Sequence, residues 1–373
     1  MPHGLHLPRL DPRDYFSAAE LRRSERYERF LRVDWLLTIV AQLAALAVLA
    51  WRGPRIARAL DLGRVGTGVM LGVLSLAIVW LATLPFGLAS EWWQRRHGIS
   101  RASYIEWLTL PWATLTGIVV DVTIAIAIVM LLAGRFRRLW WTLAAPVFVA
   151  IAVVSALVFP LLPGLSTHGV RDPALAGEIR RLAREEGVQG TPVKVERVHD
   201  VTTAANAMAE GIGPTKQVVL WDTLLDGRFA RGEIRVVVAH ELAHIAREHV
   251  WKSLAWFALF AVPGALVLAE ATRRRGGIHQ PGTIPFALLV LTVLQLALLP
   301  VSNVISRRYE AEADWIALNA TRDPASVRGL FTSFSATSLA QPRPPTWSYV
   351  LLETHPTLLQ RLAMAQAWRA RRR

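Results

Sequence analysis

Six long apolar stretches run through this chain of 373 residues, and they limit its fold more than any other feature. About 20 apolar residues in a helix cross the hydrocarbon core of a bilayer, where the helix satisfies its own backbone hydrogen bonds. The first and fifth stretches are shorter than this, and the others reach it. We therefore predict an all-α polytopic membrane protein with spans at residues 35–51, 66–90, 108–134, 139–162, 254–270 and 283–303.

Composition agrees with this class and excludes several others. Hydrophobic residues make up 53% of the chain and charged residues only 19%, which is too apolar for a water-soluble protein of this size. The absence of Cys excludes disulfides, thiolate metal sites and cysteine nucleophiles. The net charge of +14 could indicate a nucleic-acid partner, but Lys and Arg in membrane proteins gather at loop ends. We therefore expect no nucleic acid as a partner.

The segment between the fourth and fifth spans differs from its surroundings and predicts a small α+β subdomain. Its pattern favours an amphipathic helix, three short strands and a strong second helix that continues into the fifth span. Another helix is predicted after the sixth span, followed by a Pro-rich loop and a terminal helix. These predicted elements are helices at 174–186, 233–249 and 306–319 and strands at 192–198, 204–209 and 217–221.

The predicted organisation has five parts along the chain. The first is a basic tail, for which we expect no removable signal peptide, because no small-residue cleavage site follows it. The parts are the tail at 1–34, four spans at 35–162, the α+β subdomain at 163–250, a hairpin of two spans at 251–304 and a helical C-terminal segment at 305–373.

The subdomain contains the pattern HExxH, as His240-Glu241-Leu242-Ala243-His244. On a helix, residues four apart share one face, so the two imidazoles can hold one Zn²⁺ ion. Glu241 is rotated by about 100° from His240, which places its carboxylate where it can take a proton from a metal-bound water. A surface helix with two histidines is the alternative. Because apolar residues flank the pattern within one helix, we predict one zinc ion per chain.

A third protein ligand is needed, and without Cys it must be His, Asp or Glu. The turn at 273–277 allows the last two spans to form a hairpin whose arms each extend about 40 Å. The hairpin returns Glu310 to the height of the HExxH pattern, with Asp314 on the same helix face. We predict Glu310 as ligand and Asp314 as the carboxylate that orients a zinc histidine, against the alternative of a solvated acidic face. By helical spacing, Glu312 and His249 point away from the metal.

These residues resemble the membrane-embedded zinc endopeptidases typified by the type I CAAX prenyl protease, with the bacterial heat-shock membrane proteases as more distant relatives. The resemblance extends over residues 84–361, about three quarters of the chain, and its combined motifs are specific. The matching segments are HELAH at 240–244, YEAEAD at 309–314, NAMAEG at 206–211, VVLWDTLL at 218–225, His355-Pro356 with Arg361, and 84–98.

The resemblance implies further roles. In that family an Asn-containing strand binds the substrate backbone, and the matching residue here is Asn206. The histidine that matches His355 stabilises the oxyanion, and Arg361 would support it on the substrate side of the site. The relatives with the closest motifs have seven spans around a water-filled chamber, one span more than we predict for this chain.

We predict a zinc-dependent membrane endopeptidase that acts on peptide or membrane-protein substrates at the lipid bilayer. One alternative is a heat-shock-type protease for quality control of membrane proteins. A second, from another class, is a non-proteolytic scaffold or transporter with structural zinc. Glu241 discriminates between these classes, because a structural site uses a fourth protein ligand and needs no general base.

Composition also bears on location. The abundance of Arg, Ala and Leu is typical of a bacterial protein, so we expect the bacterial inner membrane. Lys and Arg in the short loops balance between the two sides, and the basic residues flanking the spans favour the N-terminal tail side as cytoplasmic. We therefore expect the active site to face the cytoplasm.

Overall fold

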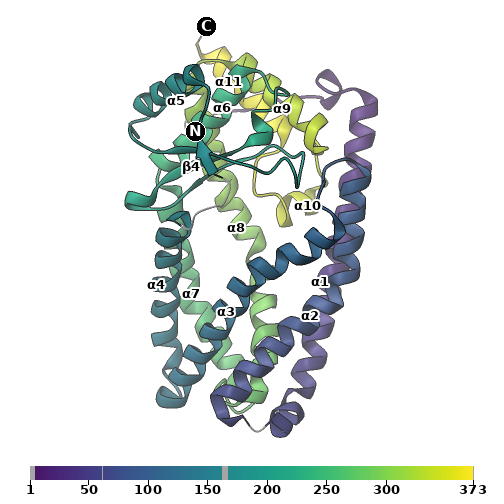
Figure 1. The fold of residues 1–373 in the computed structure, drawn as a ribbon, viewed down its shortest axis with the longest axis vertical. Helices are drawn as coiled ribbons and strands as arrows, with labels where there is room; N and C mark the ends of the chain where they lie inside the picture. Colours follow the sequence, from purple (N-terminus) through teal and green to yellow (C-terminus); the bar gives the residue numbers. More distant parts are fainter. Residues whose placement is uncertain (1–4, 61, 162–166, 373) are drawn as a thin grey trace.

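The computed structural model describes residues 5–60, 62–161 and 167–372, without the side chains of 110–120. Long helices fill the lower part of Figure 1, and a small sheet and shorter helices gather at the upper end, near both chain termini. The predicted fold class, a polytopic helical membrane protein with a small α+β subdomain, is confirmed. The long helices are α1 (Ala18–Leu60), α2 (Gly63–Arg96), α3 (Tyr104–Phe136), α4 (Trp140–Val158), α7 (His249–Arg273) and α8 (Ile284–Thr321).

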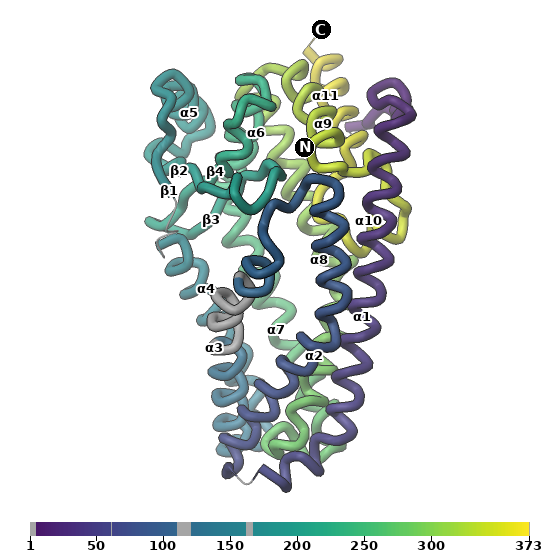
Figure 2. The backbone as a smooth tube through the Cα atoms, turned by 45° about the vertical axis from the view of Figure 1, so that its right-hand side comes forward, coloured from purple at the N-terminus to yellow at the C-terminus, as the bar shows by residue number. Residues whose placement is uncertain are grey.

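Five helical segments in the described part of the chain are long and apolar enough to cross a membrane. They overlap five of the six predicted spans. The third predicted span falls on α3, where the side chains of 110–120 lie outside the description. α1 packs along α2 and α8, and α4 packs along α7 (Figure 2). The five segments are Ala18–Leu60, Gly63–Arg96, Trp140–Leu161, His249–Arg273 and Pro281–Thr321.

Two of these helices extend beyond the predicted spans. α1 begins at Ala18, so the second half of the predicted tail is helical, and Tyr27 within it is buried. α8 has 38 residues and runs from the sixth span through the separately predicted helix at 306–319. The predicted boundary at residue 304 therefore lies inside α8. Good helix formers such as Arg, Glu and Ala continue both helices past the apolar segments.

One predicted helix is interrupted where the sequence indicates continuity. The HExxH helix, α6 (Arg231–Ala246), ends before Glu248, which has a left-handed backbone with φ of 53°. α7 then begins at His249. A left-handed residue other than Gly costs roughly 1–2 kcal/mol, and no Gly or Pro marks this point in the sequence. Sequence reasoning therefore had no signal for the break.

The subdomain holds a four-stranded sheet in the order β1-β2-β4-β3. β2 and β4 are parallel, and each outer strand is antiparallel to its neighbour. β4 coincides with its predicted range, whereas β1 was not predicted, because it has only three residues. β3 is an edge strand of this sheet. The strands are β1 (Thr167–Gly169), β2 (Val193–Glu196), β3 (Ala207–Glu210) and β4 (Gln217–Trp221).

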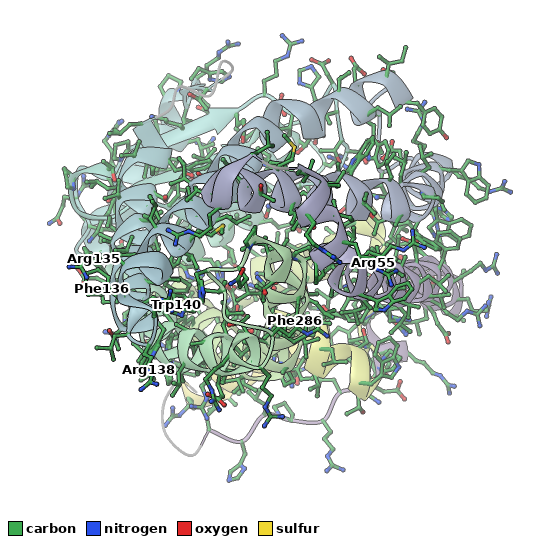
Figure 3. The ribbon with its side chains drawn as sticks, turned by 90° about the horizontal axis from the view of Figure 1, so that it is seen from below. Arg55, Arg135, Phe136, Arg138, Trp140 and Phe286 are labelled. Atoms are coloured by element: carbon green, nitrogen blue, oxygen red, sulfur yellow. The ribbon has the colours of Figure 1, made fainter. Side chains whose placement is uncertain are left out.

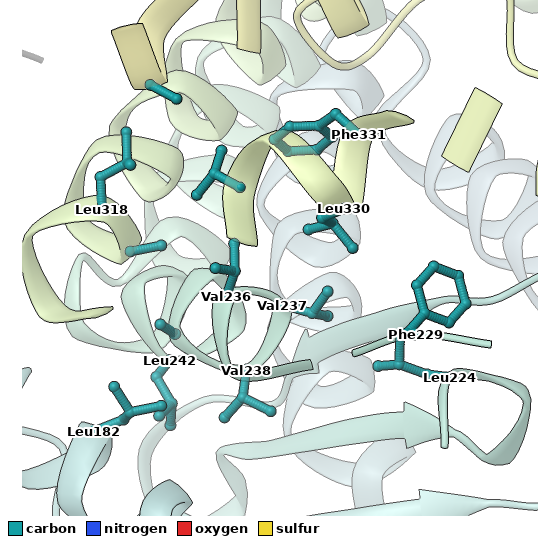
Figure 4. Packing of buried hydrophobic residues seen from close by; sticks show 14 of the residues in the cluster. Leu182, Leu224, Phe229, Val236, Val237, Val238, Leu242, Leu318, Leu330 and Phe331 are labelled. Atoms are coloured by element: carbon teal, nitrogen blue, oxygen red, sulfur yellow. The ribbon is translucent and has the colours of Figure 1, made fainter. Parts of the chain in front are cut away.

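The subdomain core surrounds α6 on all sides. Val236, Val237 and Val238 point in three directions, yet all three are buried, which marks a central helix. Around them lie Leu182 and Leu330, from α5 and α9 (Figure 4). α8 also packs along α6 and thereby joins the membrane helices to the core. The remaining helices are α5 (Pro173–Glu185), α9 (Pro324–Ser338), α10 (Thr346–Leu351) and α11 (Leu358–Arg371).

The opposite end of the bundle carries short basic loops. Arg55, Arg135 and Arg138 lie there on the molecular surface (Figure 3). Between the two ends, α3, α4, α7 and α8 line an open cavity of about 770 Å³ with almost entirely apolar walls. Tyr309 forms part of its wall, next to Glu310 in the sequence. This apolar space between the long helices therefore borders the residue that precedes the predicted ligand Glu310.

The turn between β3 and β4 depends on Gly211, whose φ of +83° disfavours every other residue type. A Cβ atom there would also lie 2.2 Å from the carbonyl oxygen of Thr215. Gly211→Ala is therefore expected to destabilise the fold by roughly 1–3 kcal/mol, measured as a lower melting temperature of the detergent-solubilised protein. Gly177→Ala is the matched control, because a Cβ on this α5 residue meets only Arg180, at 3.9 Å. Equal melting temperatures for both variants would contradict this prediction.

Candidate metal centre and active site

Three side chains converge from two helices that pack against each other. His240 and His244 come from α6, and Glu310 comes from α8. Nε2 of His240 lies 3.1 Å from Nε2 of His244 and 3.0 Å from Oε2 of Glu310. Nε2 of His244 lies 3.5 Å from Oε1 of Glu310. The structure thus brings the three predicted ligands into one triangle, whose ligand atoms all lie within 4.8 Å of one another.

The chemistry of this donor set fits a metal ion. Zinc bonds of about 2.0–2.1 Å in a tetrahedron place neighbouring ligand atoms about 3.3 Å apart, close to the three observed separations. Burial alone would lower the pKa of His240, but the carboxylates of Asp314 and Glu310 raise it to about 10. A site that favours a positive charge on imidazole to this extent also favours a divalent cation, which would displace the proton.

His240 is held from behind by a carboxylate and an arginine. Its Nδ1 lies 2.9 Å from Oδ1 of Asp314. Arg361 grips the same carboxylate through Nε at 2.7 Å and Nη2 at 2.5 Å, and its side chain is only 12% exposed. We expected Arg361 on the substrate side from the family resemblance, but its guanidinium lies behind the metal site. The forked geometry of Arg explains this position, since it matches both oxygens of a carboxylate.

His244 also has a partner, His249, which helical spacing had predicted to point away from the metal. Nδ1 of His249 lies 2.9 Å from Nδ1 of His244, and Nε2 of His249 lies 3.3 Å from Oε2 of Glu312. The prediction that His249 points away from the site assumed that α6 and α7 form one unbroken helix, whereas Glu312 lies on the unbroken α8 and reaches the site only through His249. The break at Glu248 turns His249 back toward His244.

The remaining predicted catalytic residues flank the triangle. Glu241 follows His240 on α6 and is buried. His355 lies in the loop before α11, with its Nε2 3.1 Å from Oε2 of Glu310, and its side chain is exposed. Its Nδ1 lies 2.9 Å from Oγ1 of Thr354. When that hydroxyl donates to Nδ1, the proton of the neutral imidazole is on Nε2, which faces the site.

Two residues of α8 position the loop that carries His355. Arg307 donates to the carbonyl oxygens of Tyr349 at 2.8 Å and Glu353 at 2.6 Å. Asn303 donates to the carbonyl oxygen of Val350 at 3.2 Å. Sequence reasoning missed both roles. The only signal was the presence of polar side chains one and two turns before Glu310, at the end of an apolar span.

Asn206 lies at the start of edge strand β3 and is exposed. Its carbonyl oxygen accepts from the backbone N–H of Trp221 at 3.0 Å, which fixes the residue to β4. β3 packs against α6, so the edge strand runs beside the helix that carries the histidines. An edge strand presents unpaired backbone groups, to which an extended peptide can add as a further strand.

Comparisons with known proteins identify the family. The sequence profile of Peptidase family M48 matches residues 170–369. An uncharacterized metalloprotease of Bacillus subtilis, YhfN, is 25% identical over 98% of this chain and 90% of its own length. A CAAX prenyl protease 1 homolog of Oryza sativa is 25% identical over 79% of this chain and 72% of its own length.

Solved structures agree with the fold. The crystal structure of S. mikatae Ste24p superimposes with a TM-score of 0.80 at 20% identity, covering 96% of this chain and 91% of that one. The predicted resemblance and the predicted enzyme class are confirmed. Because the family profile covers more than half of its length, this chain belongs to peptidase family M48 and is a membrane metalloendopeptidase.

Proposed function

We propose that this peptidase works with one zinc ion held by His240, His244 and Glu310. The convergence of their ligand atoms carries this proposal. Nε2 of His240 lies 3.1 Å from Nε2 of His244 and 3.0 Å from Oε2 of Glu310, and Nε2 of His244 lies 3.5 Å from Oε1 of Glu310. Two imidazoles and one carboxylate leave the fourth tetrahedral position to water, which is the arrangement of catalytic rather than structural zinc sites.

The surrounding side chains have separate roles in the proposed reaction. When bound, the metal polarises the peptide carbonyl and makes water a stronger acid. Glu241 accepts the proton of the attacking water as the water oxygen adds to the carbonyl carbon. His355 donates a hydrogen bond from Nε2 to the oxyanion that forms. Glu241 then returns the proton to the amide nitrogen as the carbon–nitrogen bond breaks.

Substrate binding in this proposal uses the edge of the sheet. An extended peptide pairs with β3, and Asn206 holds its backbone at the end of that strand. The exposure of Asn206 and the packing of β3 beside α6 support this arrangement. Both observations favour a peptide position next to His240, His244 and Glu310.

The substrates we propose are peptide segments close to a bilayer. The ligand helix α8 is itself one of the membrane-length segments, and the apolar cavity between the spans is lined by Tyr309, which precedes Glu310 in the sequence. We also propose the bacterial inner membrane with the subdomain in the cytoplasm, on the basis of the basic residues at that end. Relatives named CAAX prenyl protease support processing of a particular peptide terminus. A relative named Protease HtpX homolog, from Acidiphilium cryptum, supports the alternative of membrane-protein quality control.

A reconstituted system tests this proposal. The full chain in liposomes is given peptides tethered to the bilayer by a hydrophobic helix, with spacers of increasing length before one identical cleavable segment. We expect cleavage only near the membrane surface, loss of cleavage after treatment with a zinc chelator, and recovery when Zn²⁺ is added. The cut positions are mapped by mass spectrometry.

The same peptide without its membrane helix is the matched control. Equal cleavage of free and tethered peptides at all spacer lengths would contradict a membrane-proximal substrate. Recovery with a different divalent metal but not with Zn²⁺ would contradict the assignment of zinc.

A further inference from the structure

We infer that His249 and Glu312 form a hydrogen-bonded relay that orients the metal ligand His244. The inference rests on the proposed metal site and assigns two residues that the proposed mechanism leaves unused. His249 is 4% exposed, so its ring nitrogens have to find partners within the protein. One nitrogen meets His244 at 2.9 Å, and the other meets Glu312 at 3.3 Å.

The protons in this relay can be placed from one constraint. If His244 binds metal through Nε2, that nitrogen carries no proton, and the neutral ring bears its proton on Nδ1. Nδ1–H of His244 then donates to Nδ1 of His249. This leaves the proton of His249 on Nε2, from which it donates to the carboxylate of Glu312. Each contact therefore has one donor and one acceptor.

Glu312 is fixed in turn by Arg247, whose Nε donates to its Oε1 at 2.5 Å. The guanidinium keeps the carboxylate charged and leaves Oε2 to accept from His249. Arg247 and Glu248 form the break between α6 and α7, so the break supplies the arginine and turns His249 inward. Backbone strain of this kind persists where the surrounding contacts determine the conformation.

The ring of His249 is also held from its face. Tyr309 stacks on it with a centroid distance of 4.5 Å and an interplanar angle of 13°. Trp256 fixes Tyr309 by donating from Nε1 to its hydroxyl oxygen at 3.0 Å. His249 can therefore rotate little, and the direction of its Nδ1 is determined by the fold.

The two ligand histidines thus have similar support. His240 is backed by Asp314 and Arg361, whereas His244 is backed by His249, Glu312 and Arg247. Glu310 and Glu312 diverge by about 200° around α8, so they cannot approach His244 from the same side. Glu310 approaches the Nε2 side of the imidazole, and Glu312 acts through His249 on the Nδ1 side.

The competing explanation is that the buried ring of His249 serves only in packing. Two substitutions distinguish this packing role from the relay. His249→Phe keeps a flat ring against Tyr309 but accepts no hydrogen bond. His249→Asn loses the stacking, but its amide oxygen can take the place of Nδ1 and accept from His244. The relay predicts that Asn preserves metal binding better than Phe, and a packing role predicts the reverse order.

The test measures zinc affinity by competition with a chromophoric chelator, using the full chain in detergent after its metal has been removed. We expect His249→Phe to weaken affinity by about 10–100-fold, the usual loss when a partner of a ligand histidine is removed, and His249→Asn to weaken it less. The visible absorption bands of the Co²⁺-loaded protein should shift in the Phe variant, because the imidazole orientation changes. Melting temperatures of the metal-free variants report separately on packing.

A second comparison tests Glu312. Glu312→Gln should weaken zinc affinity in the wild-type background and have no further effect in His249→Phe, because Glu312 acts through His249. Glu270→Gln, the same change on an exposed carboxylate near the far end of α7, is the matched control and should leave affinity unchanged. The relay is overturned if His249→Phe binds zinc as tightly as wild type, or if His249→Asn loses as much affinity as Phe. If His244→Ala also binds like wild type, the ligand assignment fails and the relay fails with it.

Discussion

Replacing Glu241 with Gln is expected to leave the metal in place and to abolish peptide hydrolysis. Glutamine has nearly the same size and fits the same buried position on α6, but it cannot accept a proton from water. Loss of a general base costs on the order of 10²–10⁴-fold in rate. Because Glu241 is not among the converging ligand atoms, zinc content should stay near one ion per chain. Metal analysis and a peptide-cleavage assay on the same purified sample give both values.

The contrast between the two measurements decides the role of Glu241. Glu233→Gln is a useful control, since Glu233 is a second buried glutamate of α6 that caps the start of the helix, about two turns before Glu241. It should change stability more than catalysis per folded molecule. If Glu241→Gln cleaves peptides at the wild-type rate, another group must activate the water. If it loses its zinc, Glu241 belongs among the ligands.

Local patterns predicted the parts of the site that lie within one regular helix. His240, Glu241 and His244 could be placed relative to each other because the spacing of residues in an α-helix is fixed. The apolar spans could be recognised because a bilayer demands a minimum helix length. Glu310 could be placed only through a further assumption, that two spans of similar length form a hairpin. The structure has the two helices packed together as this requires.

Contacts that depend on irregular backbone could not be predicted in this way. His249 was placed off the site because nothing in Ala246-Arg247-Glu248 indicates the end of a helix, and the left-handed conformation of Glu248 follows from tertiary packing. Arg361 was placed by family resemblance on the substrate side. Its pairing with Asp314 joins α11 to α8, and such long-range contacts leave no local pattern in a single sequence.

Substitutions at Glu310, Asp314 and Arg361 are expected to weaken zinc binding to different degrees, with the largest loss at the ligand Glu310. Glu310→Ala removes a ligand atom and should reduce zinc affinity more than any change behind the ligands, with loss of hydrolysis. Asp314→Asn keeps the size of the side chain but weakens its hold on Nδ1 of His240, so a loss of about 10–100-fold is expected. Arg361→Lys keeps the charge but cannot form the forked contact, and its loss should be similar or smaller.

The expected order of zinc-affinity losses distinguishes an Arg361 that supports the metal site through Asp314 from an Arg361 that binds substrate. An arginine that held the substrate would raise KM when changed to Lys and would leave zinc affinity unchanged. If Arg361 instead holds Asp314, its change to Lys should weaken zinc affinity even without substrate. The same change should have little further effect once Asp314 has been changed to Asn, since both residues act through His240.

Chelator competition on Glu310→Ala, Asp314→Asn, Arg361→Lys and the double variant of Asp314 and Arg361 measures the series. Melting temperatures of the metal-free proteins are needed beside it, because removing one partner of a buried ion pair destabilises a fold by about 3–5 kcal/mol. If Arg361→Lys binds zinc like wild type and only its KM rises, the contact with Asp314 does not support the metal, and Arg361 acts on the substrate.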